Sequence, residues 1–299
     1  MTLFRLGIFV AGFFCFGFVG ASDLQTTWQP TQWQGERAMI STSSGWKAIV
    51  SLERGRLVHF GPAGNDTNLI FAPKTRDDPA GWGGDRVWLG PQAQWAQIWP
   101  PPAAWEHSGA DPVSVTAGML RLIMPEAGDG WPRLTRTYRW NGKVLVCGVE
   151  TSGGTRGAQV IHIVQVPRQT VVNVTARPDK GAPLGYVQLP SSATPRFTTD
   201  FTPPPHVTTK GQALTLRHIG HVQKLGFNPQ PLTAHEGSLG FTVSRGEQHG
   251  TVVSEPDAGF FTQVYLGGPE PFIELEQLSP SFSPGAGTSF SIELEGSAP

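Results

Sequence analysis

The stretch Leu134–Glu150, LTRTYRWNGKVLVCGVE, places strand-forming residues on both sides of Asn141-Gly142. β-Branched and aromatic residues favour strands. An Asn-Gly pair is a strong signal for a two-residue hairpin turn, because both residues tolerate the positive φ angles that this turn requires. The sequence therefore predicts two antiparallel strands, at Leu134–Trp140 and Lys143–Glu150, joined by a tight turn.

Short strand-like segments, separated by turns rich in Gly, Pro and Ser, recur along most of the chain. The further candidates are 38–43, 47–52, 56–60, 113–124, 159–167, 169–176, 185–189, 213–218, 237–244, 250–253, 260–266, 272–278 and 289–295. Glycine (37 residues) and proline (27 residues) are abundant, and charged residues make up only 15%, which disfavours long helices. Roughly 15 to 18 short strands at close spacing predict an all-β sandwich of large antiparallel sheets. No change in composition divides the chain, so we expect one domain over residues 37–299.

The N-terminus has the three parts of a secretory signal peptide. Arg5 supplies the positive charge, Leu6–Val19 is apolar, and Gly20-Ala21-Ser22 offers small residues for cleavage. The apolar run is shorter than the roughly 20 residues of a membrane-spanning helix, although an uncleaved anchor is the alternative. We expect residues 1–21 to be a signal peptide, residues 22–36 to be a leader or edge strand, and the protein to be exported to the periplasm or the extracellular space.

The charge and motif content excludes several classes of partner. The net charge is −1, and no basic patch indicates nucleic-acid binding. The histidines do not have the spacing of a zinc site, and no dinucleotide or phosphate-binding loop is present, so we expect neither a metal nor a cofactor. We expect no integral membrane span after cleavage, and the oligomeric state is left open.

Residues 73–106 are unusually rich in tryptophan and lack a regular period. The tryptophans are Trp82, Trp88, Trp95, Trp99 and Trp105, and the polar residues interleaved with or next to them are Asp85, Arg86, Gln92, Gln94, Glu106 and His107. Aromatic rings bury the C–H faces of sugar rings, while polar groups bind the hydroxyls. This segment therefore indicates a carbohydrate-binding cleft, and the alternative is that the tryptophans pack a long loop onto the core. The ligand contacts that we expect are Trp82, Trp95, Trp99, Asp85, Arg86, Gln92 and His107.

Three regions of the chain are similar in sequence and order to one family. They are WKAIV (46–50) followed by GRLVHF (55–60) and NLI (68–70), then GGDRVWLGPQ (83–92), and finally FIELEQLSP (272–280) followed by SPG (283–285). With these motifs the chain resembles the galactose mutarotase-like β-supersandwich proteins, and within them the uncharacterised bacterial DUF4380 family. The resemblance implies a supersandwich fold and a sugar ligand, with Arg86 at the position of an arginine that contacts sugar hydroxyls.

The resemblance also implies an acid–base pair for aldose 1-epimerisation, in which a glutamate on a late strand is the base and a histidine is the acid. Glu274 and Glu276 lie two apart in a predicted strand and point to the same face, and we prefer Glu276. His162 is the candidate acid, although the family's usual context around that histidine is missing. The alternatives are two solvated carboxylates and a structural histidine. Lys224, in a Lys-x-Gly element similar to one in the family, is a further ligand contact.

The sequence therefore predicts an exported carbohydrate-binding protein that, if it is an enzyme, is an aldose epimerase-like isomerase. A non-catalytic glycan-binding or structural envelope module is the alternative. His162 and a late glutamate facing one pocket would favour epimerisation. If His162 packs inside the sheet core, this epimerase mechanism fails.

Overall fold

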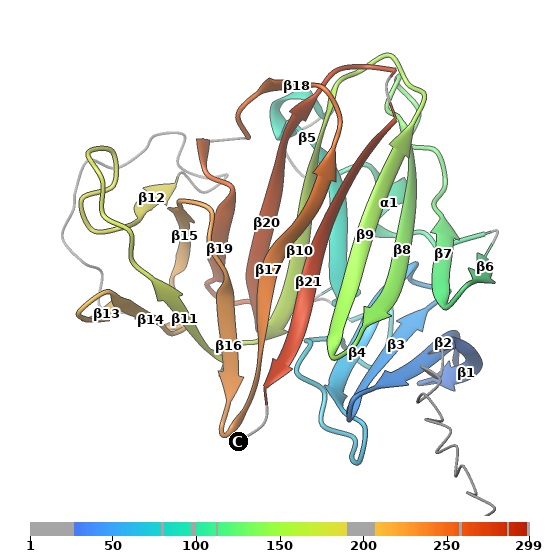
Figure 1. Ribbon diagram of the computed structural model, residues 1–299, viewed down its shortest axis with the longest axis horizontal. Helices are drawn as coiled ribbons and strands as arrows, with labels where there is room; N and C mark the ends of the chain where they lie inside the picture. Colours follow the sequence, from blue (N-terminus) through green and yellow to red (C-terminus); the bar gives the residue numbers. More distant parts are fainter. Residues whose placement is uncertain are drawn as a thin grey trace, which may run out of the picture.

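Three antiparallel β-sheets make up most of the protein (Figure 1). The computed structural model describes residues 27–78, 81–96, 100–111, 113–189, 207–256, 259–285 and 287–297. These residues form 21 strands and only two short helical turns, η1 (Gln92–Gln94) and α1 (Ala103–Glu106). The prediction of an all-β fold of large antiparallel sheets is confirmed. Within the described residues, neither helical turn approaches the length or apolar character needed to cross a bilayer.

The N-terminal part of the described chain is a four-stranded sheet in sequential order. Its strands are β1 (Gln29–Trp33), β2 (Glu36–Ser43), β3 (Trp46–Ser51) and β4 (Arg56–Pro62). β1 pairs only with β2 and is the edge strand among the described residues. This sheet matters for the site because β4 supplies Arg56 and the backbone that receives Asp85.

The seven-stranded sheet has the order β12-β15-β19-β20-β10-β5, with β18 pairing with β20 outside this path. Its strands are β5 (Asp85–Gly90), β10 (Ala158–Pro167), β12 (Val187–Leu189), β15 (Val222–Phe227), β18 (Val252–Ser254), β19 (Thr262–Gly267) and β20 (Phe272–Phe282). The central strands β10 and β20 are nearly continuous runs of buried residues, as expected for strands that are covered on both faces.

The ten-stranded sheet has the order β13-β14-β11-β16-β17-β21-β9-β8-β7-β6. Its strands are β6 (Val113–Thr116), β7 (Met119–Ile123), β8 (Arg133–Asn141), β9 (Val144–Ser152), β11 (Val171–Thr175), β13 (Val207–Lys210), β14 (Ala213–Leu216), β16 (Leu232–Glu236), β17 (Leu239–His249) and β21 (Thr288–Ser297). The predicted hairpin joins β8 to β9, with Asn141 paired to Val144 and Gly142 at a φ of 59°.

The core lies between the seven-stranded and ten-stranded sheets. β17 and β21 of the larger sheet contact β20 of the smaller one, and the two sheets overlie each other in Figure 1. Ile273 and Leu275 on β20 and Phe241 and Ile292 on the ten-stranded sheet are each almost fully buried in one cluster. Burial of such side chains stabilises the fold by about 1.5–3 kcal/mol each. We call the core-facing side of the seven-stranded sheet its inner face and the opposite side its outer face.

Asp85 is the centre of a polar cluster inside this core. Its carboxylate accepts a hydrogen bond from the Leu57 backbone N–H of β4 (2.7 Å) and pairs with Arg136 of β8 (2.5 Å). It also contacts His162 Nε2 of β10 (3.1 Å), and the Tyr138 hydroxyl lies 3.3 Å away. One carboxylate therefore connects strands from all three sheets.

The pKa values in this cluster follow from burial and from charge. Burial alone would raise the pKa of Asp85, but the Arg136 charge and the His162 hydrogen bond outweigh it and lower the pKa to about 2. Burial lowers the pKa of His162, and the bond to Asp85 only partly offsets this effect. Asp85 is therefore ionised in the folded protein at neutral pH, while the imidazole of His162 is held neutral.

Four strands lie outside the segments that the sequence pattern indicates. They are β5, β13, β15 and β16. β5 lies inside the Trp-, Pro- and Gly-rich stretch, where no period organises the whole segment. Only six residues, DRVWLG, form the strand, and all six are buried, so neither length nor alternation marks it.

We expect Asp85→Asn to lower the free energy of unfolding by about 3–5 kcal/mol, because the amide leaves the buried Arg136 without a counter-charge. Urea denaturation followed by tryptophan fluorescence measures this loss. Glu150→Gln is the control, since the Arg121–Glu150 pair is about 40% exposed and should contribute less than about 1 kcal/mol. Equal losses in the two variants would contradict the assignment.

We also expect an acid-dependent loss of stability from the same carboxylate. The folded pKa of Asp85 is about 2 and its ordinary value is 3.8, so its stabilisation is fully present above pH 3.8 and is lost as the pH falls through 2. Denaturation curves between these pH values should therefore show a steeper decline for the natural protein than for Asp85→Asn. Parallel declines would argue against this linkage.

Candidate functional site

A transverse row of polar side chains crosses the outer face of the seven-stranded sheet. The register places Lys224 of β15 opposite Tyr265 of β19, Tyr265 opposite Glu274 of β20, and Glu274 opposite Gln165 of β10. Residues that are directly opposite in antiparallel strands share a face. Four neighbouring strands therefore contribute one polar residue each, over about 14 Å at a strand spacing of about 4.8 Å.

A second row lies two residues further along each strand. It contains Gln263 of β19, Glu276 of β20 and Arg86 of β5, with Ile163 of β10 between the last two. The face thus presents two carboxylates, Glu274 and Glu276, with a cation toward each side. The two rows together form the candidate site.

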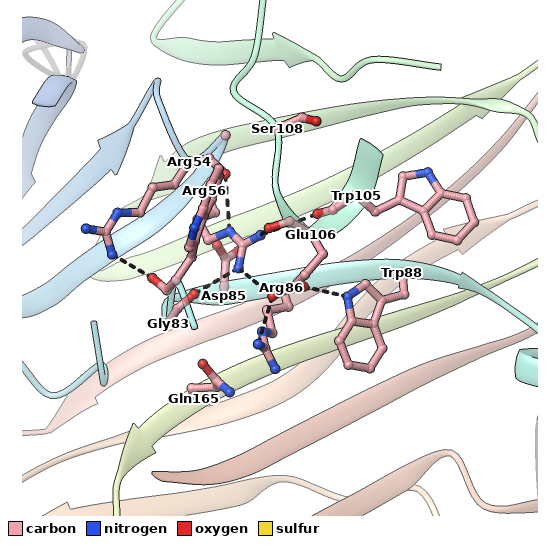
Figure 2. A network of polar contacts seen from close by, with 12 residues as sticks. Arg54, Arg56, Gly83, Asp85, Arg86, Trp88, Trp105, Glu106, Ser108 and Gln165 are labelled. Atoms are coloured by element: carbon pink, nitrogen blue, oxygen red, sulfur yellow. Dashed lines mark hydrogen bonds and ion pairs between the residues drawn. The ribbon is translucent and has the colours of Figure 1, made fainter. Parts of the chain in front are cut away.

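Arg86 is held between two carboxylates. Its Nη1 donates to Glu274 Oε1 and its Nη2 donates to Glu106 Oε1, each at 2.8 Å. Figure 2 shows Arg86 and Glu106 pointing toward one another. Burial would lower the pKa of Arg86, but Glu106 and Glu274 raise it above its ordinary value. The guanidinium is therefore charged and fixed in direction. Gly81, at a φ of 82°, lies against it, and a Cβ there would stand 3.3 Å from Arg86 Nη2.

Glu106 comes from α1 and is itself tightly bound. Its Oε2 accepts a hydrogen bond from Trp88 Nε1 (2.9 Å), and its backbone carbonyl accepts one from Arg56 Nη2 (2.7 Å). Arg56 also lies 3.7 Å from the Glu106 carboxylate. Burial raises the pKa of Glu106, but Arg86 and Arg56 lower it overall. Arg56, Glu106 and Arg86 alternate in charge (Figure 2), and the pair between Arg86 and Glu274 extends this alternation by one carboxylate.

Lys224 and Tyr265 form the more open side of the site. Lys224 Nζ lies 2.9 Å from Glu276 Oε2, and the lysine side chain is 25% exposed whereas that of Glu276 is 3% exposed. Tyr265 is half-buried. Burial raises its pKa to about 12, with smaller contributions from Glu274, Glu270 and Glu276, so the phenol keeps its proton. A ligand that approaches from this side meets the partly exposed Lys224 and Tyr265 before it meets the nearly buried Glu276.

Glu274 lies between opposing influences. Burial raises its pKa, Arg86 lowers it, Glu276 raises it again, and the net direction is upward. Gln165 Nε2 donates to Glu274 Oε1 at 2.8 Å. Within the described residues, Gln165 Oε1 and Arg86 Nε are buried without a hydrogen-bond partner. One acceptor and one donor thus lie unsatisfied beside the same carboxylate, a combination that a hydroxyl group matches.

An apolar row borders the polar one. Val222 of β15 is opposite Gly267 of β19, and Phe272 of β20 is opposite Pro167 of β10. Val222 is 48% exposed, whereas Phe272 is 5% exposed and packs its ring against Phe71 with centroids 5.5 Å apart. The exposed apolar surface of this row is therefore at Val222, two residues along β15 from Lys224.

The structure brings together four of the residues predicted from the sequence: Arg86, Glu274, Glu276 and Lys224. The expectation that Glu274 and Glu276 share one face of a strand agrees with their register. Both glutamates therefore lie on the outer face, in the two rows described above. They differ in their partners, since Glu274 pairs with Arg86 and Glu276 with Lys224.

The prediction that His162 faces the same pocket as a late glutamate is wrong. His162 is paired with Gln277, so it lies on the inner face, whereas Glu276 and Glu274 lie on the outer face. His162 is 1% exposed and contacts Asp85. Asp85, predicted as a ligand contact, is also on the inner face and fully buried, because it precedes the outward-pointing Arg86 by one residue. Neither residue can touch a ligand on the outer face.

The other predicted contacts lie around the β5 side of the site. Trp82 is half-buried and meets the exposed His107 edge-to-face at 5.3 Å. Gln92 is half-buried in η1. Trp95 is 7% exposed, donates to the Leu89 carbonyl and packs against Trp88, so it serves packing rather than a ligand. Trp99 lies outside the described residues.

Sequence reasoning missed roles for Tyr265, Gln165 and Arg56, and it assigned none to Glu106. Tyr265 alternates with apolar residues in the predicted strand 260–266, so its face follows from the pattern once Glu274 is placed opposite. Arg56 and Glu106 come from different parts of the chain, and no local signal indicates that they meet.

Neither a protein-family model nor a curated protein sequence matches the chain. Solved structures are nevertheless similar in fold. A putative aldose 1-epimerase from Escherichia coli K12 aligns over 92% of this chain and 100% of its own, at 13% identity and a TM-score of 0.60. A putative mutarotase from Salmonella typhimurium aligns over 91% and 94% at 13% identity and a TM-score of 0.56. A galactose mutarotase-like protein from Lactobacillus casei aligns over 87% and 100% at 12% identity and a TM-score of 0.57. The chain therefore has a galactose mutarotase-like fold.

We expect Glu106→Gln to destabilise the protein by about 3 kcal/mol, because both Arg86 and Arg56 lose a buried counter-charge. Thermal and urea unfolding measure this effect. Glu126→Gln is the control, since the Arg133–Glu126 pair is more than half exposed. A change in Glu106→Gln no larger than in the control would contradict a structural role for this carboxylate.

Proposed function

We propose that the protein is a carbohydrate-binding protein whose ligand lies on the outer face of the seven-stranded sheet. The observation that supports this most directly is the pairing of a polar row with an apolar row. Lys224 and Tyr265 offer partly exposed polar groups beside the exposed Val222, and the nearly buried Glu274 and Gln165 continue the polar row. A sugar ring has the same division between hydroxyls and C–H faces.

Each polar group has a role in this proposal. Lys224 and Tyr265 donate to ligand oxygens at the open side, and the carboxylates of Glu274 and Glu276 accept from ligand hydroxyls. A hydroxyl that reaches Arg86 Nε and Gln165 Oε1 satisfies both buried atoms, which requires a small opening of the site. The similar solved structures named as an aldose epimerase and as mutarotases add support for a sugar ligand.

Epimerisation by a glutamate base and His162 is not part of the proposal, because the sheet separates the two groups. Binding needs only the convergence of donors, acceptors and apolar surface. We therefore propose a binding protein rather than an epimerase. Polarimetry of the purified protein with aldoses tests this, and catalysed mutarotation would contradict it.

We also propose that the ligand is met outside the cytoplasm, after export directed by residues 1–21. Three features of the N-terminal sequence support export: the positive charge of Arg5, the apolar run that follows it, and the small residues 20–22. Placement in the DUF4380 branch remains a proposal that rests on the three quoted segments. Fractionation of cells that express the full chain tests export, and retention of the protein in the cytoplasm would contradict it.

We expect a glycan array to show binding by the purified protein, and Tyr265→Phe to bind the same glycan about tenfold more weakly, because one hydrogen bond is lost. Isothermal titration calorimetry measures the affinities. Tyr265 is only half-buried, so the variant should fold. Lys143→Gln, on an exposed pair of the ten-stranded sheet, is the control and should bind normally. Absence of binding to any carbohydrate would overturn the proposal.

A further inference from the structure

Among the residues that the structure describes, each cation of the site is paired with a carboxylate. Arg86 is bound to Glu106 and Glu274, Lys224 to Glu276, and Arg56 to Glu106. In these pairs three positive side chains meet three negative ones. Glu270, which together with Glu274 and Glu276 raises the pKa of Tyr265, adds a further negative charge at the open side. Within the described part of the site, no cation is left over for an anionic ligand.

The pairing of each cation with a carboxylate has opposite consequences for acidic and for uncharged ligands. A carboxylate or sulfate group that bound the remaining N–H donors of Lys224 would lie beside Glu276 without a cation of its own. To take the charge of Lys224 for itself, it would have to displace Glu276. The displaced glutamate would remain nearly buried without its counter-charge, beside another glutamate on the same strand face. Leaving a buried charge unpaired is strongly unfavourable.

An uncharged hydroxyl meets no such penalty. A hydroxyl both donates and accepts, so it can bind to a carboxylate oxygen and to the ammonium of Lys224 while the ion pair stays intact. Lys224 has three N–H donors, of which the contact with Glu276 Oε2 uses one. Ligand binding then adds hydrogen bonds to an existing pair rather than competing with it.

We infer that the site selects uncharged glycans over acidic ones, and that Glu276 determines this specificity by keeping Lys224 occupied. The inference rests on the proposed function and adds the charge class of the ligand. Glu276 is the key residue rather than Glu274 because its partner Lys224 is the partly exposed cation, at 25%, whereas the Arg86 side chain is 7% exposed. Removal of the Glu276 charge therefore leaves a reachable ammonium without a counter-ion.

The test is a paired array of cello- and malto-oligosaccharides, each printed in its native form and in a form oxidised at C6 to the uronate. We expect the natural protein to bind native forms and to bind their oxidised counterparts about 100-fold more weakly or not detectably. Glu276→Gln should bind the oxidised forms about tenfold or more better than the natural protein does. Glu150→Gln removes the same charge from the ten-stranded sheet, and it should behave like the natural protein.

The outcomes separate the inference from the proposed function. Binding of oxidised forms as tight as that of native forms, by the natural protein, would overturn the inference and leave carbohydrate binding intact. A natural protein that binds neither form would overturn both. Preference for native forms without any gain in Glu276→Gln would refute the role of Glu276. If Glu276→Gln fails to fold by circular dichroism, Glu276→Ala repeats the test, because it removes the same carboxylate and leaves no polar group in its nearly buried place, and no gain there would count against the inference in the same way.

Discussion

The carboxylate of Asp85 is the interaction on which the rest of the structure depends. It binds a backbone N–H of β4, an arginine of β8 and a histidine of β10, so three sheets meet at one buried charge. The carboxylate also determines where the site forms. With Asp85 held on the inner face, the next residue along the extended strand, Arg86, must point outward toward Glu274 and Glu106.

The sequence predicts the architecture well because the relevant signals are local. The Asn141-Gly142 turn, the abundance of Gly and Pro and the repeated short apolar runs each indicate strands and hairpins without knowledge of the tertiary structure. β5 escapes detection because its six residues are apolar or polar in no regular order and are buried on both faces. Its position in the sheet depends on pairing with β10, which lies about 70 residues later in the chain.

The site is predictable only in part, because some of its features are local in sequence and others depend on long-range strand pairing. Glu274 and Glu276 share a face because they are two residues apart, which is a local property. Whether His162 shares that face depends on its pairing with Gln277 rather than with either glutamate. β10 is apolar on both sides, so its sequence does not distinguish the inner from the outer face. Among the tryptophans expected to contact a ligand, Trp95 instead donates its N–H to the Leu89 carbonyl, a partner that lies six residues earlier and that the clustering of tryptophans does not reveal.

The alternating ladder from Arg56 to Glu274 has a consequence for how such a protein can diverge. Each member neutralises its neighbours, so a substitution that alters the charge of one member leaves another uncompensated in a poorly solvated place. Descendants of this sequence should therefore change these positions in compensating pairs, with a lost carboxylate matched by a lost cation. Covariation between position 86 and positions 106 and 274 would be the evolutionary signature of that constraint, and it would persist even where the ligand differs.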